Sequence, residues 1–168
     1  MSKRWKINPI HKKVIGELFE PIGKKVNTIL DAGSGRTSLY FLTKKFPKSK
    51  ITAIIYPGDK RKSEGIKESI HNDFLLKEVD IKNFDPIKKF DVVLAHLLLG
   101  EATKFNKNKF DEILDSLFKI KSKFIVIIDV FDDPEVNYGK ILKKISSTGE
   151  IKKVYSKDKY LGFLIERK

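Results

Sequence analysis

A short segment near the start of the chain joins an acidic residue to two glycines, and this combination can hold a ligand that carries positive charge. Asp31 ends an apolar run, and Gly33 and Gly35 follow it before a helical pattern begins. Glycine lets a backbone adopt positive φ and approach a ligand closely. The first turn of a helix offers free N–H groups to an anion. A carboxylate in such a turn repels the pyrophosphate of a dinucleotide but attracts an ammonium group.

The glycine spacing also argues against a dinucleotide site, because the third position of Gly-x-Gly-x-x-Gly is Ser38 here. Instead, Leu30-Asp31-Ala32-Gly33-Ser34-Gly35 resembles the first motif of class I S-adenosylmethionine-dependent methyltransferases. Their ligand carries an ammonium, a sulfonium and a carboxylate on one arm. The family often has a further glycine where this chain has Thr37. The cofactor contacts that the resemblance implies in this segment are Asp31, Gly33, Ser34 and Gly35.

The resemblance also implies contacts after the second and third strands. The family places an acid at the end of strand two to hold the ribose hydroxyls, but this chain has Tyr56 there. Asp59 follows a Pro-Gly turn and could reach the ribose or be an ordinary turn residue, while Tyr56 could stack on adenine. Asp80 and Ile81 stand where the family places an acid on the adenine amino group and an apolar neighbour on the ring.

The segment after the fourth strand should hold the catalytic residues, because ligands of parallel sheets bind at the carboxyl ends of the strands. His96 could act as a general base toward a hydroxyl, or could simply line the pocket. Glu101 is the one acid in the segment that follows it, residues 97–103. The segment lacks the Asn/Asp-Pro-Pro-aromatic motif of adenine and cytosine amino methyltransferases. We therefore take His96 and Glu101 as the catalytic candidates, and His96 also as a cofactor contact.

Three acids follow the fifth strand and raise the question of a metal site. Asp129, Asp132 and Asp133 could hold Mg²⁺ through their oxygens. An acid directly before Pro134 is also typical of a helix cap and first turn. The helix cap is the better interpretation, so we predict no metal site.

The order of apolar patterns then predicts the elements that position these residues. Period-3.6 patterns alternate with apolar runs, which indicates right-handed βαβ crossovers and a parallel sheet. Strands are expected over residues 25–31, 50–56, 74–79, 90–96, 124–130, 151–155 and 160–165. Helices are expected over residues 10–19, 39–46, 63–71, 110–118 and 136–145. The fold predicted is α/β, a three-layer αβα sandwich whose seven-stranded, mostly parallel sheet ends in an antiparallel hairpin. The strand order is taken from the family.

Length and composition bound the protein further. The 168 residues predict a single domain, with an N-terminal segment and helix over residues 1–24 and a Rossmann-like core over residues 25–168. Without cysteine there is neither a disulfide nor a covalent cytosine-C5 mechanism. The absence of a long apolar run predicts a cytoplasmic protein without a membrane span.

The net charge of +13 points to an anionic partner such as RNA, or to a lysine-rich solvated surface. Lysine supplies 31 of the 35 cations, whereas arginine is the usual residue for bidentate phosphate and base contacts. The resulting expectation is an S-adenosylmethionine-dependent methyltransferase acting on RNA or a small molecule. The alternatives are an S-adenosylmethionine lyase and a non-catalytic domain that binds S-adenosylmethionine or RNA.

Overall fold

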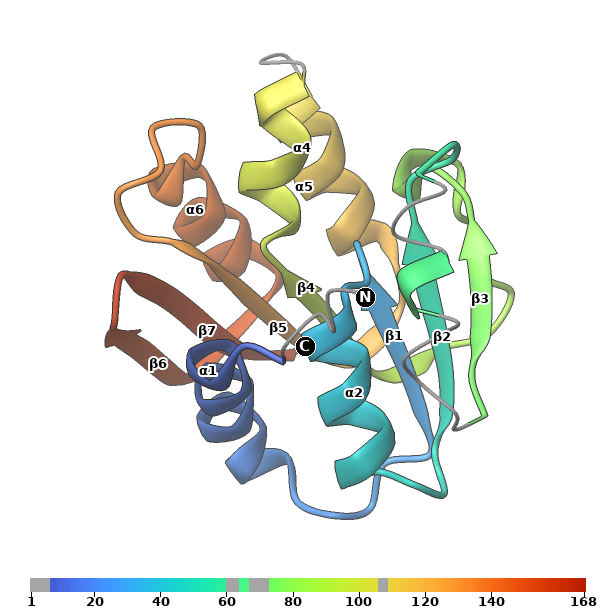
Figure 1. Ribbon diagram of the computed structural model, residues 1–168. Coiled ribbons are helices and arrows are strands. Elements are labelled where there is room, and N and C mark those ends of the chain that lie inside the picture. The colour runs from blue at the N-terminus through green and yellow to red at the C-terminus, as the bar shows by residue number, and fades with distance from the viewer. Residues whose placement is uncertain (1–6, 60–63, 67–72, 106–108) are drawn as a thin grey trace.

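The computed structural model describes residues 7–59, 64–66, 73–105 and 109–168, and its centre is one sheet of seven strands (Figure 1). The strand order is β3-β2-β1-β4-β5-β7-β6. The strands are β1 Thr28–Ala32, β2 Lys50–Ile55, β3 Leu75–Glu78, β4 Phe90–His96, β5 Ser122–Val130, β6 Gly149–Lys157 and β7 Tyr160–Arg167. The α-helices are α1 Pro9–Phe19, α2 Arg36–Lys45, α4 Leu98–Phe105, α5 Lys109–Lys119 and α6 Tyr138–Thr148. Short 3₁₀ helices cover Glu20–Ile22 and Ile81–Asn83.

The sheet confirms the predicted fold class. Strands β1 to β5 run parallel to one another, and β7 lies antiparallel between β5 and β6. The order reverses at β1, which pairs with β2 on one side and β4 on the other. Such a switch point leaves a crevice at the carboxyl ends of the strands, where α/β proteins bind ligands.

Helices cover both faces of the sheet and bury one apolar cluster on each (Figure 1). On one face α1 and α2 contribute Val14, Leu18 and Leu42, which are fully buried. On the other face α5 and α6 contribute Leu117 and Ile141, also fully buried. Burial of each such side chain stabilises the fold by about 1.5–3 kcal/mol before conformational entropy is counted. The central strands are therefore covered on both sides, as their continuous apolar sequences predict.

Several boundaries differ from those predicted. Helix α2 begins at Arg36, three residues before the apolar period starts, because Gly35 in extended conformation forms its N-cap. Strand β1 spans Thr28–Ala32, later than predicted, since the lysines before it lie in a loop. Helix α4 was not predicted separately, because its eight residues are too few for a clear period. Residues 64–66 are helical as predicted, and the rest of the helix predicted over 63–71 lies outside the described residues.

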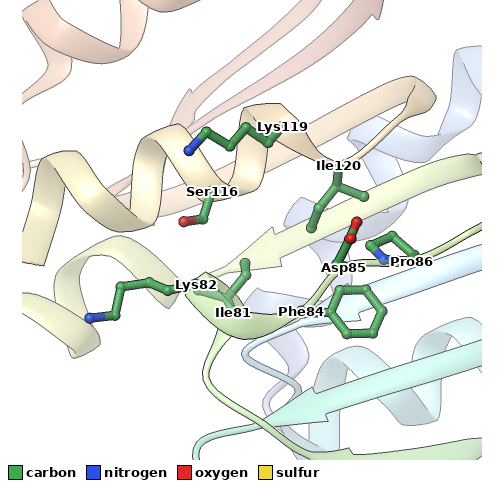
Figure 2. Close-up of a pocket in the computed structure, with 8 residues that line it drawn as sticks. All are labelled: Ile81, Lys82, Phe84, Asp85, Pro86, Ser116, Lys119 and Ile120. Carbon is green, nitrogen blue, oxygen red and sulfur yellow. The ribbon is translucent and has the colours of Figure 1, made fainter.

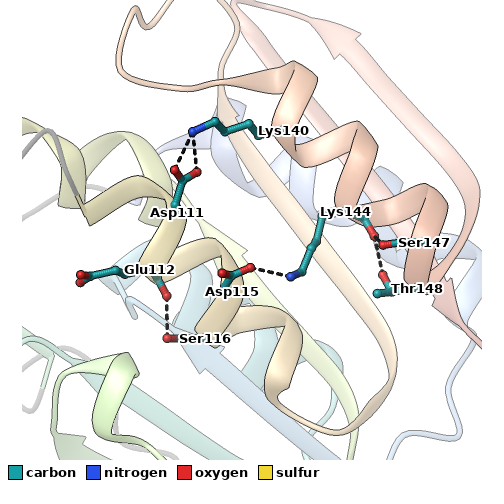
Figure 3. A network of polar contacts seen from close by, with 8 residues as sticks. All are labelled: Asp111, Glu112, Asp115, Ser116, Lys140, Lys144, Ser147 and Thr148. Carbon is teal, nitrogen blue, oxygen red and sulfur yellow. Dashed lines mark hydrogen bonds and ion pairs between the residues drawn. The ribbon is translucent and has the colours of Figure 1, made fainter.

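Charged pairs join α5 to α6 across the outer face of the sheet (Figure 3). The Lys140 ammonium lies 2.6 Å from a carboxylate oxygen of Asp111, and the Lys144 ammonium lies 2.5 Å from Asp115. These pairs are largely exposed, and each is worth up to about 1 kcal/mol. Their main consequence is that the lysines on this face are neutralised by acids.

Candidate functional site

Five parallel strands end at one edge of the sheet, and nearly every residue singled out in the sequence lies there. The turn after β1 holds Asp31 and the two glycines, and the turn after β2 begins at Tyr56. Asp80 follows β3, His96 is the last residue of β4, and Asp129 lies near the end of β5. The parallel register brings these positions together because all five strands point the same way.

A buried carboxylate holds the turn between β1 and α2. Asp31 is fully buried, and its Oδ2 accepts hydrogen bonds from the hydroxyls of Ser34 at 2.5 Å and Ser38 at 2.7 Å. The Ser38 hydroxyl also accepts from the Gly35 N–H at 3.1 Å. Hydrogen bonds to a buried charge are worth about 1.5–3 kcal/mol each. Asp31 therefore fixes the conformation of the turn from beneath it. Ser38 is a site residue that the sequence analysis missed, because the usual capping residues at this helical position are glutamate and glutamine.

The two glycines of the turn have different surroundings. Gly33 has a φ of 69°, and a β-carbon there would lie 2.7 Å from Leu98 Cδ1. Gly33 is thus required by the packing of the turn against α4. A β-carbon on Gly35 would meet only the Ser38 hydroxyl, at 3.9 Å. The backbone of Gly35 is therefore the part of the turn that a ligand can approach.

The turn after β2 is exposed and carries the candidate ribose contacts. The Asp59 N–H donates to the Tyr56 carbonyl at 3.3 Å, and Gly58 between them has a φ of 84°. Asp59 is exposed, and the Tyr56 ring is 60% exposed. The Lys109 ammonium lies 5.3 Å from the centre of the Tyr56 ring, a cation–π contact. Both predicted residues reach the carboxyl edge, on the side of β2.

Asp80 and Ile81 lie on the neighbouring strand end. The Asp80 carboxylate accepts from the Lys82 N–H at 3.1 Å and caps the 3₁₀ helix that follows. Ile81 is buried against the core between the sheet and α5. The capping hydrogen bond explains the position of the Asp80 carboxylate without a ligand. The same position, at the carboxyl edge of the sheet, is also compatible with a ligand contact.

His96 lies in an aromatic and polar cluster that only the tertiary structure assembles. Its ring is nearly buried and meets the ring of His11 edge to face, with centroids 4.7 Å apart. His11 Nε2 lies 2.6 Å from the Tyr160 hydroxyl. Burial lowers the pKa of His11, and the nearby charge of Glu101 opposes that shift. The structure thus brings His96 and Glu101 to one place, together with His11 and Tyr160, which no sequence signal identified.

A strained residue lets α4 begin immediately after β4. Leu97 has a φ of 58°, a conformation that costs a non-glycine residue roughly 1–2 kcal/mol. Its N–H donates to the Ile128 carbonyl at 2.7 Å, and its carbonyl accepts from the Glu101 N–H. This tight turn aims the first N–H groups of α4 at β5 and places Glu101 beside the histidines.

Asp129 receives those N–H groups. It is buried, and its Oδ1 accepts from the Gly100 N–H at 3.0 Å. A β-carbon on Gly100 would lie 2.8 Å from Asp133 Oδ2 and 3.1 Å from Asp129 Oδ1, so glycine lets both carboxylates approach the helix. Burial raises the pKa of Asp129 to about 7, against the effect of its backbone hydrogen bonds.

The helix cap predicted at the acid before Pro134 is wrong, because α6 begins at Tyr138 and its N-cap is Asn137. Asp133 Oδ1 instead accepts from the Glu135 N–H at 3.0 Å within a turn. Among the residues that the structure describes, no group of three or more histidines or acids is arranged to hold a metal ion.

Comparison with solved structures decides what kind of fold this is. NodS from Bradyrhizobium japonicum WM9, an N-methyltransferase solved with S-adenosyl-L-homocysteine, superposes with a TM-score of 0.71 at 15% identity. The match covers 98% of this chain and 91% of NodS. A TehB-like S-adenosylmethionine-dependent methyltransferase from Corynebacterium glutamicum gives a TM-score of 0.66 at 15% identity, covering 96% of this chain and 100% of that one. The chain has the class I methyltransferase fold.

Other proteins with this methyltransferase fold are larger. The mitomycin 7-O-methyltransferase MmcR matches 95% of this chain at 13% identity with a TM-score of 0.70, but only 53% of MmcR is covered. An Escherichia coli rRNA methylase and the 16S rRNA methylase RmtB are covered over 64% and 63% of their lengths. The chain thus spans between half and two thirds of these three relatives. No family model and no curated protein sequence matches the chain.

No helix in the described part of this methyltransferase fold has the length and apolar character needed to cross a bilayer.

The environment of Asp129 gives a testable pH dependence. Because burial raises its pKa from 3.8 to about 7, the folded protein holds a proton there that the unfolded chain releases. This contribution to stability is present below about pH 4 and is lost as the pH rises to about 7. Asp129→Asn should therefore gain stability relative to wild type over this range, by at most about 4 kcal/mol at pH 8.

Denaturant unfolding at several pH values measures this difference. Asp132→Asn, at an exposed acid three residues further on, is the matched control and should follow the wild-type profile. Parallel profiles for wild type and Asp129→Asn would show that Asp129 is already ionised in the fold.

Proposed function

We propose that this chain binds S-adenosylmethionine at the carboxyl edge of its sheet and transfers the methyl group to an acceptor. The observation that carries the proposal is the turn after β1. There the buried Asp31 is joined through the Ser38 hydroxyl to the N–H of Gly35, whose backbone is open, at the switch point of the sheet. This arrangement suits the amino-acid arm of the cofactor, which carries both signs of charge.

The proposed contacts follow the strand ends. Gly33, Ser34 and Gly35 form the surface against the amino-acid arm, and Asp31 supplies negative charge beneath it. Asp59 replaces the usual ribose acid from its exposed turn, and Tyr56 lies against the adenine. Asp80 and Ile81 take the edge and face of the adenine ring, and His96 closes the site near the methyl group.

For methyl transfer, the main task of the protein is to align the acceptor atom with the methyl group. The cofactor supplies a methyl group already activated on a sulfonium. The chain must hold the acceptor in line with it, since orientation alone accounts for a large part of such rate enhancements. His96 and Glu101 are placed to take a proton from a hydroxyl acceptor, and His11 lies beside both.

The acceptor class is RNA or a small molecule. The names of proteins with this fold show that their methyl acceptors differ. NodS is an N-methyltransferase, MmcR an O-methyltransferase and RmtB an rRNA methylase. The lyase alternative gains no support from these structures. Incubation with S-adenosylmethionine alone separates the two, because a lyase consumes it without an acceptor whereas a methyltransferase leaves it intact.

Gly35→Val tests whether the cofactor lies against the turn. Gly35 has an extended backbone with φ of −125°, which valine adopts readily, and no described atom lies within 3.9 Å of the added β-carbon. The variant should keep its thermal midpoint and lose S-adenosylmethionine binding by calorimetry. Gly33→Val is a poorer test, because it would also displace Leu98.

Gly16→Ala, whose β-carbon makes an ordinary 3.6 Å contact with Phe41, is the control and should bind like wild type. Unchanged affinity in folded Gly35→Val would exclude the turn as the cofactor site.

Asp31→Asn tests the charge beneath the turn. Asparagine keeps an oxygen that accepts from Ser34 and Ser38 but removes the negative charge. We expect S-adenosylmethionine affinity to fall by about 1.5–3 kcal/mol, with adenosine affinity much less affected because adenosine has no ammonium group.

Asp91→Asn, at the opposite edge of the sheet, is the control. Its carboxylate also accepts hydrogen bonds within the protein, from the N–H groups of Asn27 and Thr28, so the variant removes a hydrogen-bonded charge far from the turn. Equal losses for both ligands in Asp31→Asn would mean that Asp31 only shapes the turn.

His96→Ala and Glu101→Gln test the proposed base. With a hydroxyl acceptor, the variant that removes the base should lower turnover about 10²–10⁴-fold and leave cofactor affinity nearly unchanged. Transfer of tritiated methyl from S-adenosylmethionine to total RNA and to a small-molecule extract supplies the assay. A parallel fall of affinity and turnover in His96→Ala would instead make His96 a wall of the pocket.

A further inference from the structure

Four loops gather exposed lysines at the edge of the sheet opposite to the proposed cofactor site. We define this basic edge as residues 23–27, 45–50, 85–89 and 119–123, which precede β1, β2, β4 and β5. These segments contain two, three, two and three lysines respectively, all exposed, and Asp85 is their one acid. Because parallel strands begin at the same edge, the topology brings all four loops together.

Hydrogen bonds between the loops confirm that they adjoin. The Lys50 N–H donates to the Asn27 carbonyl at 2.8 Å, which joins the first two segments. The Phe90 N–H donates to the Lys121 carbonyl at 2.9 Å, which joins the last two. The carboxylate of Asp91, which directly follows the third segment and Phe90, accepts from two backbone N–H groups.

The lysines of this edge differ from those elsewhere on the molecule. On the α5–α6 face, Lys140 and Lys144 are each paired with an acid (Figure 3). On β6, Lys152 pairs with Glu150 and Lys153 lies 2.7 Å from Glu20. No lysine of the basic edge makes an ion pair with any residue that the structure describes. The basic edge therefore gathers ten exposed lysines that no described acid pairs.

A cavity of about 210 Å³ adjoins this edge (Figure 2). Phe84, Asp85 and Pro86 face Ser116, Lys119 and Ile120 across it, and Ile81 and Lys82, which follow β3, also line it. The two segments that wall the cavity continue directly into Lys88–Lys89 and Lys121. The cavity thus offers a hydrophobic surface, a carboxylate and a hydroxyl within a rim of cations.

We propose that the basic edge and this cavity bind a single-stranded nucleic acid, with phosphates along the lysines and a base in the cavity. Binding of single strands combines cations that follow the backbone with apolar or aromatic surfaces for the bases. The Asp85 carboxylate and the Ser116 hydroxyl can meet polar groups on a base edge. The lysine ammonium attracts phosphates as a point charge and does not recognise individual bases. We therefore expect binding with little sequence preference.

A membrane surface fits this edge less well. Insertion into a bilayer needs a broad apolar face, usually on an amphipathic helix. The basic edge is made of loops, and Ile87 is its one large exposed hydrophobic side chain in the part of the chain described. The lysines of the basic edge lie at the opposite end of the strands from the glycine turn, so their contribution is independent of methyl transfer. The cavity shares Ile81 with the proposed adenine contacts.

Fluorescence anisotropy of the full chain with labelled 12-nucleotide oligouridylate over a range of salt tests the charge component. Lys88→Gln/Lys89→Gln/Lys121→Gln should weaken binding roughly tenfold or more at about 50 mM salt and reduce the magnitude of the log–log salt slope by about 2. The control, Lys12→Gln/Lys143→Gln/Lys157→Gln, removes three exposed lysines elsewhere and should bind almost like wild type. Equal losses in both triple variants would overturn the proposal in favour of diffuse charge.

Ser116→Met tests the cavity, which the longer side chain should fill. Affinity should fall roughly tenfold with an unchanged salt slope, because base contacts and not phosphates are lost. Ser147→Met is the control, since Ser147 also bonds a preceding helix carbonyl but lies on α6.

Oligothymidylate, duplex RNA and phosphatidylserine vesicles complete the comparison. Similar affinity for the two single strands and weaker binding of the duplex would support the proposal. No oligouridylate binding at about 50 mM salt, or lysine-dependent binding of vesicles alone, would overturn it. Duplex binding as strong as oligouridylate binding, with Ser116→Met unaffected, would also overturn it, because it would leave only a phosphate surface.

Discussion

The candidate site depends on one buried carboxylate. Asp31 ends the central strand inside the protein, where an ion without hydrogen bonds would cost several kcal/mol. Two hydroxyls from the following turn compensate for that burial, and this requirement fixes where the chain must bend. The same bonds tie the carboxylate to the start of α2, because the Ser38 hydroxyl also accepts from the Gly35 N–H. The residue that suits a positively charged ligand is therefore also the residue that shapes its site.

A second buried carboxylate organises the neighbouring strand ends. Asp129 accepts the N–H groups at the start of α4, and Leu97 adopts a strained conformation so that the helix can begin there. Strain of this kind persists only where surrounding contacts enforce it, and it concentrates near functional sites. Its effect here is to bring Glu101 next to the pair of histidine rings.

The two edges of the sheet differ in chemistry. The carboxyl edge holds acids, histidines and glycine turns, with Lys82 and Lys109 beside them, whereas the amino edge gathers ten exposed lysines beside a cavity. This difference follows from parallel topology, because every loop before a strand lies at one end and every loop after a strand at the other. One small chain can in this way present a small-ligand site and a polyanion surface on different loops.

The sequence alone determined the alternation of strands and helices, the fold class and the positions of Asp31, Tyr56, Asp80 and His96 at strand ends. These are local properties, since apolar period and turn residues depend on near neighbours. The sequence did not reveal His11 and Tyr160 beside His96, because contacts across 149 residues leave no periodic signal. It also did not reveal that Gly33 is packed and Gly35 open, which depends on where α4 lies. The lysines had likewise looked evenly spread, and only the common direction of the strands collected ten of them at one edge. Tertiary structure decided these features because each is a relation between segments that folding alone brings together.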